Sequence, residues 1–133
     1  MEFAIGVGLS LAVTGFATAV GLDRDRAFYP TVLIVIASYY ALFAVMGASG
    51  QIVMVESLVA GAFLLVAVIG FKMSLGLVAA ALVGHGVFDF VHSLAIENPG
   101  VPHWWPGFCL AFDVTAGGYL AVLLMRRSRG SST

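Results

Sequence analysis

The chain has 133 residues, of which 61% are hydrophobic and 10% are charged, and its formal net charge is −1. Soluble domains average about half apolar and a quarter charged residues, so this composition excludes an ordinary water-soluble domain. Nothing in the charge predicts a nucleic-acid partner, and the single cysteine, Cys109, excludes a disulfide within the chain. The composition therefore predicts one domain that resides in the lipid bilayer.

Five apolar runs are each long enough to cross a bilayer as a helix of about 20 residues. They cover residues 3–22, 27–47, 52–71, 73–95 and 107–125. The N-terminus lacks the basic region of a secretory signal, so we expect the first run to be retained as a span. The sequence thus predicts an all-α membrane helix bundle over residues 1–125, followed by a basic tail over residues 126–133.

The positive charges predict the orientation of this bundle. With five spans, all six basic residues fall on one side of the membrane: Arg24, Arg26, Lys72, Arg126, Arg127 and Arg129. The positive-inside rule then places the tail in the cytoplasm and the N-terminus outside. We expect a polytopic protein of the cell (inner) membrane, with Trp104 and Trp105 at the outer interface.

Ionisable side chains inside the fourth run are the most informative feature of the sequence. His85, Asp89 and His92 are spaced i, i+4 and i+7, which puts them on one face of a helix. An ionisable group in hydrocarbon costs about 2.5–3.5 kcal/mol, so such groups face partners inside a bundle. Gly84 and Gly86 flank the first histidine, and we expect them to let another backbone or a substrate come close.

Two more carboxylates, Glu56 and Asp113, lie in the third and fifth runs. At a rise of 1.5 Å per residue, Glu56, Asp89 and Asp113 all lie about 7–9 Å below the outer ends of their helices. Tyr39 and Tyr40 in the second run reach a comparable depth. We therefore predict one buried polar site that opens toward the outside, formed by Glu56, His85, Asp89, His92 and Asp113.

The residue types in this predicted site favour metal or acid–base chemistry. Imidazole and carboxylate are usual ligands of zinc, iron and manganese, so all five side chains are candidate ligands of a divalent metal ion. Glu56, Asp89 and Asp113 are also candidate catalytic groups, because a desolvated carboxyl beside a histidine can move protons. Tyr39 or Tyr40 could donate a hydrogen bond to a developing oxyanion.

The leading hypothesis is a membrane-embedded enzyme that acts on a small apolar or lipid-like substrate, because entry from the bilayer does not suit a strongly charged molecule. A metal-ion or proton transporter component is an alternative, since carboxylate–histidine chains mark such pathways. The apolar stretch before His85 favours a one-sided pocket over a pathway. An accessory subunit of a membrane complex, with a purely structural polar cluster, is a second alternative.

Other segments are interpreted structurally. In the first run, Gly8 and Ala12, like Gly15 and Ala19, have the small-residue spacing of close helix packing, which we expect to serve the bundle rather than a dimer. A homo-oligomer is nevertheless plausible. Asp23 or Asp25 is expected to cap a helix, and binding of lipid phosphate by Arg24 and Arg26 is the less favoured reading of that loop.

The loop over the predicted site contains prolines and tryptophans. The stretch NPGVPHWWPG, residues 98–107, should be stiff and non-helical, and it is a candidate lid or entry rim. His103 is interpreted as an interface anchor. Cys109 is interpreted as a small packing residue rather than a metal ligand.

The order Glu56, His85-x3-Asp89-x2-His92, Asn98-Pro99, Pro106, Cys109 and Asp113 resembles a family of small bacterial integral membrane proteins catalogued as a domain of unknown function. The Arg-x-Phe-Tyr-like stretch over residues 26–29 adds to the resemblance, which is strongest over residues 84–118. The chain departs from the family pattern at Ser93, where a second histidine is expected, and this puts a three-histidine ligand set in doubt. The resemblance groups these residues together but implies no activity.

Overall fold

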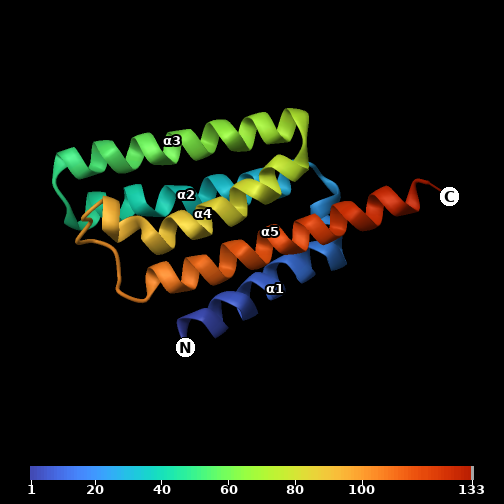
Figure 1. Ribbon diagram of the computed structural model, residues 1–133, viewed down its shortest axis with the longest axis horizontal. Helices are drawn as coiled ribbons and strands as arrows, with labels where there is room; N and C mark the ends of the chain where they lie inside the picture. Colours follow the sequence, from blue (N-terminus) through green and yellow to red (C-terminus); the bar gives the residue numbers. More distant parts are fainter. Residues whose placement is uncertain (133) are drawn as a thin grey trace.

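The computed structural model describes residues 1–132, and within them the chain is helical without strands (Figure 1). The helices are α1 (Glu2–Val20), α2 (Phe28–Gly47), α3 (Gly50–Met73), α4 (Leu75–Ala95) and α5 (Trp105–Gly130), with a 3-10 turn η1 (Leu22–Arg24) between the first two. All five α-helices are long and apolar enough to span a membrane. The predicted fold class and span count are confirmed.

The connections follow from local sequence. Gly21 ends α1 with φ 85°, a left-handed conformation that suits a residue without Cβ. Ser49 caps α3 by accepting a hydrogen bond from the Ile52 N–H at 3.4 Å. Ser74 alone separates α3 from α4, and its hydroxyl accepts from the Gly76 N–H at 3.1 Å. Pro106 lies in the first turn of α5, where its missing N–H has no cost.

The helices form a bundle in which α4 and α5 make the most extensive contact. Helix α1 packs on the far side of α5, while α2 packs on α3 and also touches α4, so that α1 and α3 form opposite edges (Figure 1). Apolar side chains from α2, α4 and α5 fill the middle, including Leu33, Val78, Leu82 and Leu120, which are all fully buried. Helix α4 is therefore placed between the helices that carry the other predicted site residues.

Small residues allow α5 to approach its neighbours closely. A Cβ at Gly117 would lie 2.8 Å from the Ala79 carbonyl oxygen of α4, and one at Gly86 would lie 3.0 Å from the Asp113 Cβ. Both distances are shorter than ordinary carbon contacts, so these positions exclude larger side chains. The prediction that Gly86 permits a close approach is confirmed. Gly84 has open space around its Cβ position, so no other segment of residues 1–132 approaches it, and the expectation of a substrate there stays a prediction.

Helix α1 packs through a different stripe from the one predicted. Its buried residues are Gly6, Ser10, Thr14 and Ala17, spaced at helical intervals against α5. Gly8 is exposed and a Cβ there would meet nothing within 4 Å, so the predicted role of the Gly8 and Ala12 stripe in bundle packing was wrong. The reason is that Ser10 and Thr14 bury their hydroxyls by bonding carbonyl oxygens, of Phe112 and Ser10 respectively.

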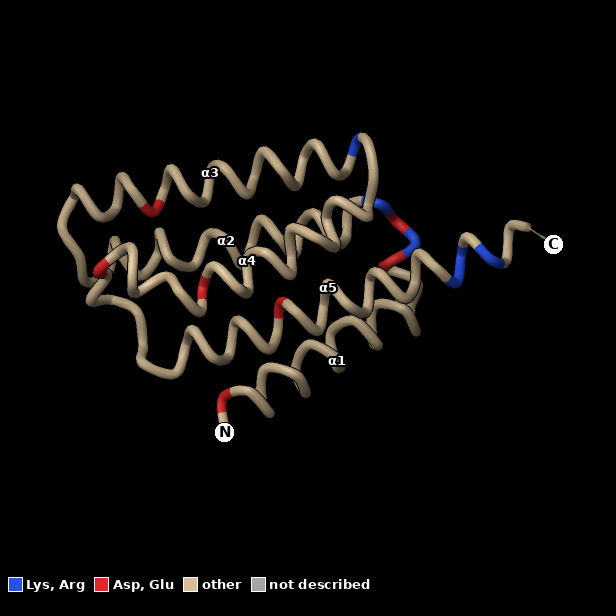
Figure 2. Tube along the Cα trace, viewed as in Figure 1, with Lys and Arg blue, Asp and Glu red and all other residues tan. Residues whose placement is uncertain are grey.

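The basic side chains gather at one end of the bundle (Figure 2). We call this the basic end, made of residues 21–27, 72–74 and 126–132, and the opposite end, with residues 48–49 and 96–104, the Trp-loop end. The tail predicted from residue 126 begins as a continuation of α5, which ends at Gly130. Asp25 accepts a hydrogen bond from the Ala27 N–H, but the N-cap of α2 is Ala27 and no side chain caps this helix, so the predicted capping was wrong. Asp23 instead is buried and bonded to Thr18.

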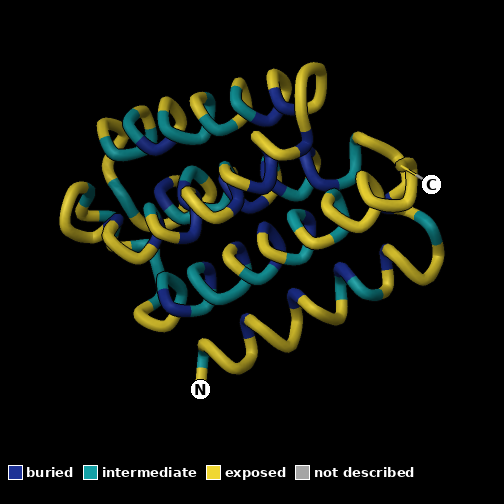
Figure 3. Tube along the Cα trace, turned by 45° about the vertical axis from the view of Figure 1, so that its right-hand side comes forward, coloured by how far each residue is buried: buried dark blue, intermediate teal, exposed yellow. Residues whose placement is uncertain are grey.

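The outer surfaces of the bundle are apolar along its length. Exposed residues cover the outward sides of α1 and α3 (Figure 3), and many are large hydrophobic side chains such as Leu9, Phe16, Leu58 and Leu65. Contiguous apolar surface of this extent is unfavourable in water and favourable in hydrocarbon. The surface, like the helix lengths, is that of a membrane protein.

Candidate functional site

All five predicted site residues are buried. Their side chains come from α3, α4 and α5, and their exposed fractions are small: Glu56 1%, His85 2%, Asp89 0%, His92 2% and Asp113 0%. The predicted shared face of α4 is confirmed, since the two histidines and Asp89 all point into the bundle. Their hydrogen bonds and ion pairs divide the five residues into two adjacent groups rather than one.

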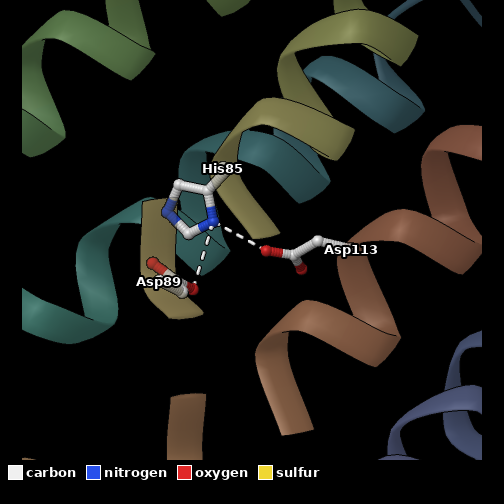
Figure 4. Close-up of side chains that lie close together, drawn as sticks. All are labelled: His85, Asp89 and Asp113. Carbon is white, nitrogen blue, oxygen red and sulfur yellow. Dashed lines mark hydrogen bonds and ion pairs between the residues drawn. The ribbon is translucent and has the colours of Figure 1, made fainter. Parts of the chain in front are cut away.

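The first group is the His85 triad, formed by His85, Asp89 and Asp113 (Figure 4). The His85 Nδ1 atom lies 2.7 Å from the Asp113 Oδ2 atom, a hydrogen bond between α4 and α5. The same nitrogen lies 3.4 Å from the Asp89 Oδ2 atom, one helical turn along α4. Gly86 permits this arrangement, because any larger residue would press against the Asp113 Cβ. One imidazole nitrogen thus faces two carboxyl groups.

The triad has more acceptors than donors. Cys109 is buried beside both acids, and its thiol, a weak donor, hydrogen-bonds to Asp89. Apart from this thiol, the buried Asp89 Oδ1 and Oδ2 atoms and the buried Asp113 Oδ1 atom have no hydrogen-bond partner within residues 1–132. A buried carboxylate oxygen without a strong donor costs free energy unless a proton or a cation compensates for it. The triad therefore has unsatisfied capacity to bind a positively charged atom.

The second group is the Glu56 pair, formed by Glu56 and His92. The His92 Nε2 atom lies 2.8 Å from the Glu56 Oε1 atom, which joins α4 to α3. The Asn98 amide donates to the same Oε1 atom at 2.9 Å and to the Tyr40 carbonyl oxygen at 3.1 Å. The Tyr40 ring lies over the His92 ring with centroids 4.0 Å apart. The pair is thus tied to the loop above it and to α2.

The two predicted tyrosines have different surroundings. Tyr40 is buried, its hydroxyl has no hydrogen-bond partner among the described residues, and its electrostatic neighbours include Asp89, Glu56 and Asp113. Tyr40 therefore lies between the two groups. Tyr39 instead packs edge-on against Trp105, with ring centroids 5.3 Å apart. Of the two, only Tyr40 is positioned to donate a hydrogen bond within the site.

Reasoning from residue chemistry missed the role of Asn98. Its amide fastens the loop to the site, and a Cβ at the nearby Gly100 would overlap the Phe43 carbonyl oxygen, so the loop lies directly on α2. The Asn-Pro-Gly sequence is a turn signal, and a polar residue in a turn next to buried acids was the available hint. His103 is exposed, which is compatible with its predicted place at the interface.

An apolar cavity of about 840 Å³ reaches the triad from the side of α1 and α2. Its walls are formed by α1, α2 and α5 and include Val13, Val35, Phe112 and Asp113. Volumes of this size are typical of small-molecule sites, which are mostly apolar with a few polar groups. Asp113 is the carboxyl group of the triad that forms part of this wall.

The triad has a geometry that fits a metal ion. One ligand atom from each of its three residues lies within 4.8 Å of the other two. Tetrahedral ligands at ~2.0–2.1 Å from a zinc ion would stand about 3.3 Å apart. The 3.4 Å between His85 Nδ1 and Asp89 Oδ2 agrees with this spacing, whereas the 2.7 Å to Asp113 Oδ2 is a hydrogen-bond distance that would have to lengthen around an ion. Three protein ligands leave a further position free, as in catalytic sites. Glu56 and His92 are predicted ligands that the structure pairs with each other outside this group.

Comparison with protein-family models, curated proteins and solved structures gives no match for this chain.

Proposed function

We propose that this protein is a membrane-embedded enzyme with a divalent metal ion bound by His85, Asp89 and Asp113, and that it acts on a lipid-like substrate. The observation that carries the proposal is the excess of buried carboxylate oxygens around one imidazole nitrogen. Within residues 1–132, three of these oxygens have no donor other than the weak Cys109 thiol, which bonds to Asp89. A divalent cation compensates for two buried negative charges at once, which a protonated histidine cannot do.

When bound, such a metal would act as a Lewis acid and lower the pKa of a water molecule. The residues around it supply position and a dry environment. Asp113 and His85 hold each other across α4 and α5 at 2.7 Å, and Phe63 packs edge-on against the His85 ring with centroids 4.6 Å apart. Tyr40 brings a buried hydroxyl without a partner to the same region, and we assign it a positioning role toward a polarised oxygen of the substrate.

The cavity supports a lipid-like substrate. Its wall is apolar except at a few positions, one of which is Asp113 of the triad. A membrane protein draws apolar molecules from the bilayer, where they are concentrated, and a cavity between helices gives them a path to a buried site. The orientation with the basic end in the cytoplasm remains part of the proposal, as does a location in the inner membrane of a bacterium.

The transporter alternative receives less support. Between the triad and the basic end, the core includes the inaccessible apolar side chains of Leu33, Val78, Leu82, Ala116 and Leu120, and the Tyr29 hydroxyl is its one polar group within residues 1–132. Ions and protons need polar groups or water along their route. An apolar plug of this depth favours a pocket with access from one side.

The test is elemental analysis of the detergent-purified protein. We expect about one zinc, iron or manganese ion per chain, and loss of at least nine-tenths of it in His85→Ala and Asp113→Asn. The matched control is His92→Gln, which removes an imidazole from the same face of α4 but keeps a donor for Glu56.

Retention of the metal by Asp113→Asn, or equal loss from His92→Gln, would count against the triad as the ligand set. A metal-free wild-type protein that also fails to take up zinc, iron or manganese on dialysis would remove the metal from the proposal. Circular dichroism on each variant separates a lost ligand from a lost fold.

A further inference from the structure

We infer that the cavity between α1 and α2 binds one acyl chain of an anionic lipid, with the headgroup at Arg24 and the far part of the chain at the His85 triad. This inference deepens the proposed function and rests on it only in taking the triad as the reactive site. Binding of the lipid itself depends on the cavity and on Arg24, whether or not a metal is present.

The cavity has the length of an acyl chain. Along α1 it runs from Leu9 to Gly21, and along α2 from Ala27 to Tyr39, which is ~18 Å in each case at 1.5 Å per residue. The hydrocarbon core of a bilayer is about 30 Å thick, so one lipid chain reaches about 15 Å. Val35, in the cavity wall, is 45% exposed, so the cavity communicates with the surroundings of the bundle. A chain can thus enter sideways.

The charged mouth of the cavity identifies the headgroup. Gly21, Leu22 and Asp25 line this end, and the Arg24 side chain lies over it, its Nε atom 3.5 Å from where a Gly21 Cβ would be. Arg24 is exposed, and its guanidinium has no hydrogen bond or ion pair among residues 1–132. The Asp25 Oδ1 atom accepts from the Ala27 N–H.

Two other arginines at the basic end, Arg26 and Arg127, have protein partners, whereas Arg126 and Arg129 are exposed on the last turns of α5, outside the cavity lining. Arg26 donates two hydrogen bonds to the Phe71 carbonyl oxygen, at 3.1 and 2.7 Å, and Arg127 donates to the Asp23 carbonyl oxygen. Arg24 is therefore available for a ligand at the mouth of the cavity. A guanidinium binds phosphate through paired N–H groups, which suits the phosphate of an anionic phospholipid. The basic residues around it (Figure 2) also attract an anionic leaflet.

Asp113 of the triad lines the cavity far from Arg24, and beyond Asp113 the cavity continues to Tyr39 and Trp105. The Ser10 hydroxyl donates to the Phe112 carbonyl oxygen at 2.8 Å, which sets Asp113 beside the Leu9 end of the cavity wall. Eleven residues of α1 separate Ser10 from Gly21, a distance of ~16 Å along the axis. A lipid held at Arg24 would thus present the distal carbons of its chain, and not its headgroup, to the triad. The substrate class is an anionic lipid modified on its acyl chain.

The test measures binding of oleoyl lysophosphatidylglycerol to the purified protein, with zwitterionic oleoyl lysophosphatidylcholine as the comparison, by native mass spectrometry. We expect the anionic lipid to bind at least tenfold more tightly. Arg24→Gln should abolish that preference, while the matched control Arg126→Gln, another exposed arginine at the basic end, should keep it. Val35→Trp should fill the cavity and weaken the binding of both lipids at least tenfold. Leu42→Trp, on the exposed surface of α2 outside the cavity, should leave the binding of both lipids unchanged.

Metal content and lipid binding are measured on the same preparations, so the proposed metal site and the proposed lipid site can each be disproved without the other. Asp113→Asn should lose metal and keep lipid, and Val35→Trp should keep metal and lose lipid. Unchanged lipid binding in Val35→Trp would overturn the inference, as would an Arg24→Gln protein that still prefers the anionic lipid. A change from dimer to monomer in Val35→Trp, without any loss of lipid, would assign the cavity to a second copy of the chain instead.

Discussion

The His85 triad and the Glu56 pair are built from the same residue types on the same face of α4, yet their hydrogen bonding differs. In the pair, one carboxylate oxygen of Glu56 is bonded by both His92 and Asn98. In the triad, a single histidine nitrogen faces two carboxyl groups, and three of their oxygens have no donor among the described residues apart from the weak Cys109 thiol at Asp89. The Glu56 Oε2 atom of the pair also lacks a partner there, so the pair has one unsatisfied oxygen and the triad has more.

This difference assigns different tasks to two groups one helical turn apart. A satisfied buried pair holds helices and loops in place, because removing either member leaves the other uncompensated. A group with unsatisfied acceptors can bind a cationic ligand. The rest of the bundle must be stable enough to tolerate those acceptors when no ligand is bound. We therefore expect changes at His92 to affect mainly the stability of the fold, and changes at His85 to affect mainly ligand binding.

The largest expected effect tests the structural task of the pair. Glu56→Ala leaves His92 Nε2 and the Asn98 amide without their shared acceptor. We expect a loss of about 3–5 kcal/mol in the free energy of unfolding, measured by tryptophan fluorescence during titration with a denaturing detergent. Asp89→Asn, measured without metal, should change the same quantity by less than about 1 kcal/mol, because Asp89 has only a weak thiol donor in Cys109 and a 3.4 Å contact with His85 Nδ1, and asparagine keeps one acceptor oxygen. Equal losses of unfolding free energy in the two variants would contradict the proposed difference between the Glu56 pair and the His85 triad.

The second prediction tests the binding capacity of the triad. Zinc at 100 times its dissociation constant should raise the free energy of unfolding by about 2.7 kcal/mol, since a ligand that binds the folded state stabilises it. The increase should be absent in Asp113→Asn and intact in His92→Gln. Unfolding with and without zinc provides the measurement, and a chelator should reverse the increase. An increase that disappears in His92→Gln would place the metal at the pair.

The third prediction concerns the loop that the pair holds. Asn98→Ala removes three hydrogen bonds: the side chain donates to Glu56 and to the Tyr40 carbonyl oxygen, and it accepts from the Gly100 N–H. We expect local opening of residues 96–104 to become easier by about 2 kcal/mol, which corresponds to roughly 30-fold faster amide exchange. Hydrogen–deuterium exchange of that segment measures the effect. His103→Ala changes an exposed residue of the same loop and should leave its exchange rate as it is.

The fold could be predicted from sequence because bilayer thickness fixes helix length and composition. Each predicted span agrees with a helix to within a few residues, apart from the longer C-terminal end of α5. The face of α1 could not be predicted in the same way. Gly8 and Gly6 are equally small, and the choice between them depends on which face carries Ser10 and Thr14, whose hydroxyls bond buried carbonyl oxygens.

The members of the site could also be predicted, since burial of charge in hydrocarbon forces ionisable groups toward one another. Its division into two groups could not. Helical spacing gives the face and depth of Glu56 and Asp113, but not which histidine each contacts, because that depends on how α3 and α5 are placed around α4. The contribution of Asn98 depends in turn on a loop whose path no periodicity describes.

The smallest expected effect tests how finely the triad is positioned, and it uses two glycines that the sequence treats alike. A Cβ at Gly86 would lie 3.0 Å from the Asp113 Cβ, whereas one at Gly84 would meet nothing within 4 Å. Gly86→Ala should therefore push α5 outward by a few tenths of an ångström and weaken zinc binding about tenfold, because metal ligands tolerate little displacement. Gly84→Ala should bind zinc as the wild type does, since its added methyl group points into open space. Competition with a chelator of known affinity measures both. If the two alanine variants bind zinc equally, the distance between α4 and α5 at Gly86 does not set the ligand geometry, and Asp113 must adjust independently of the helix that carries it.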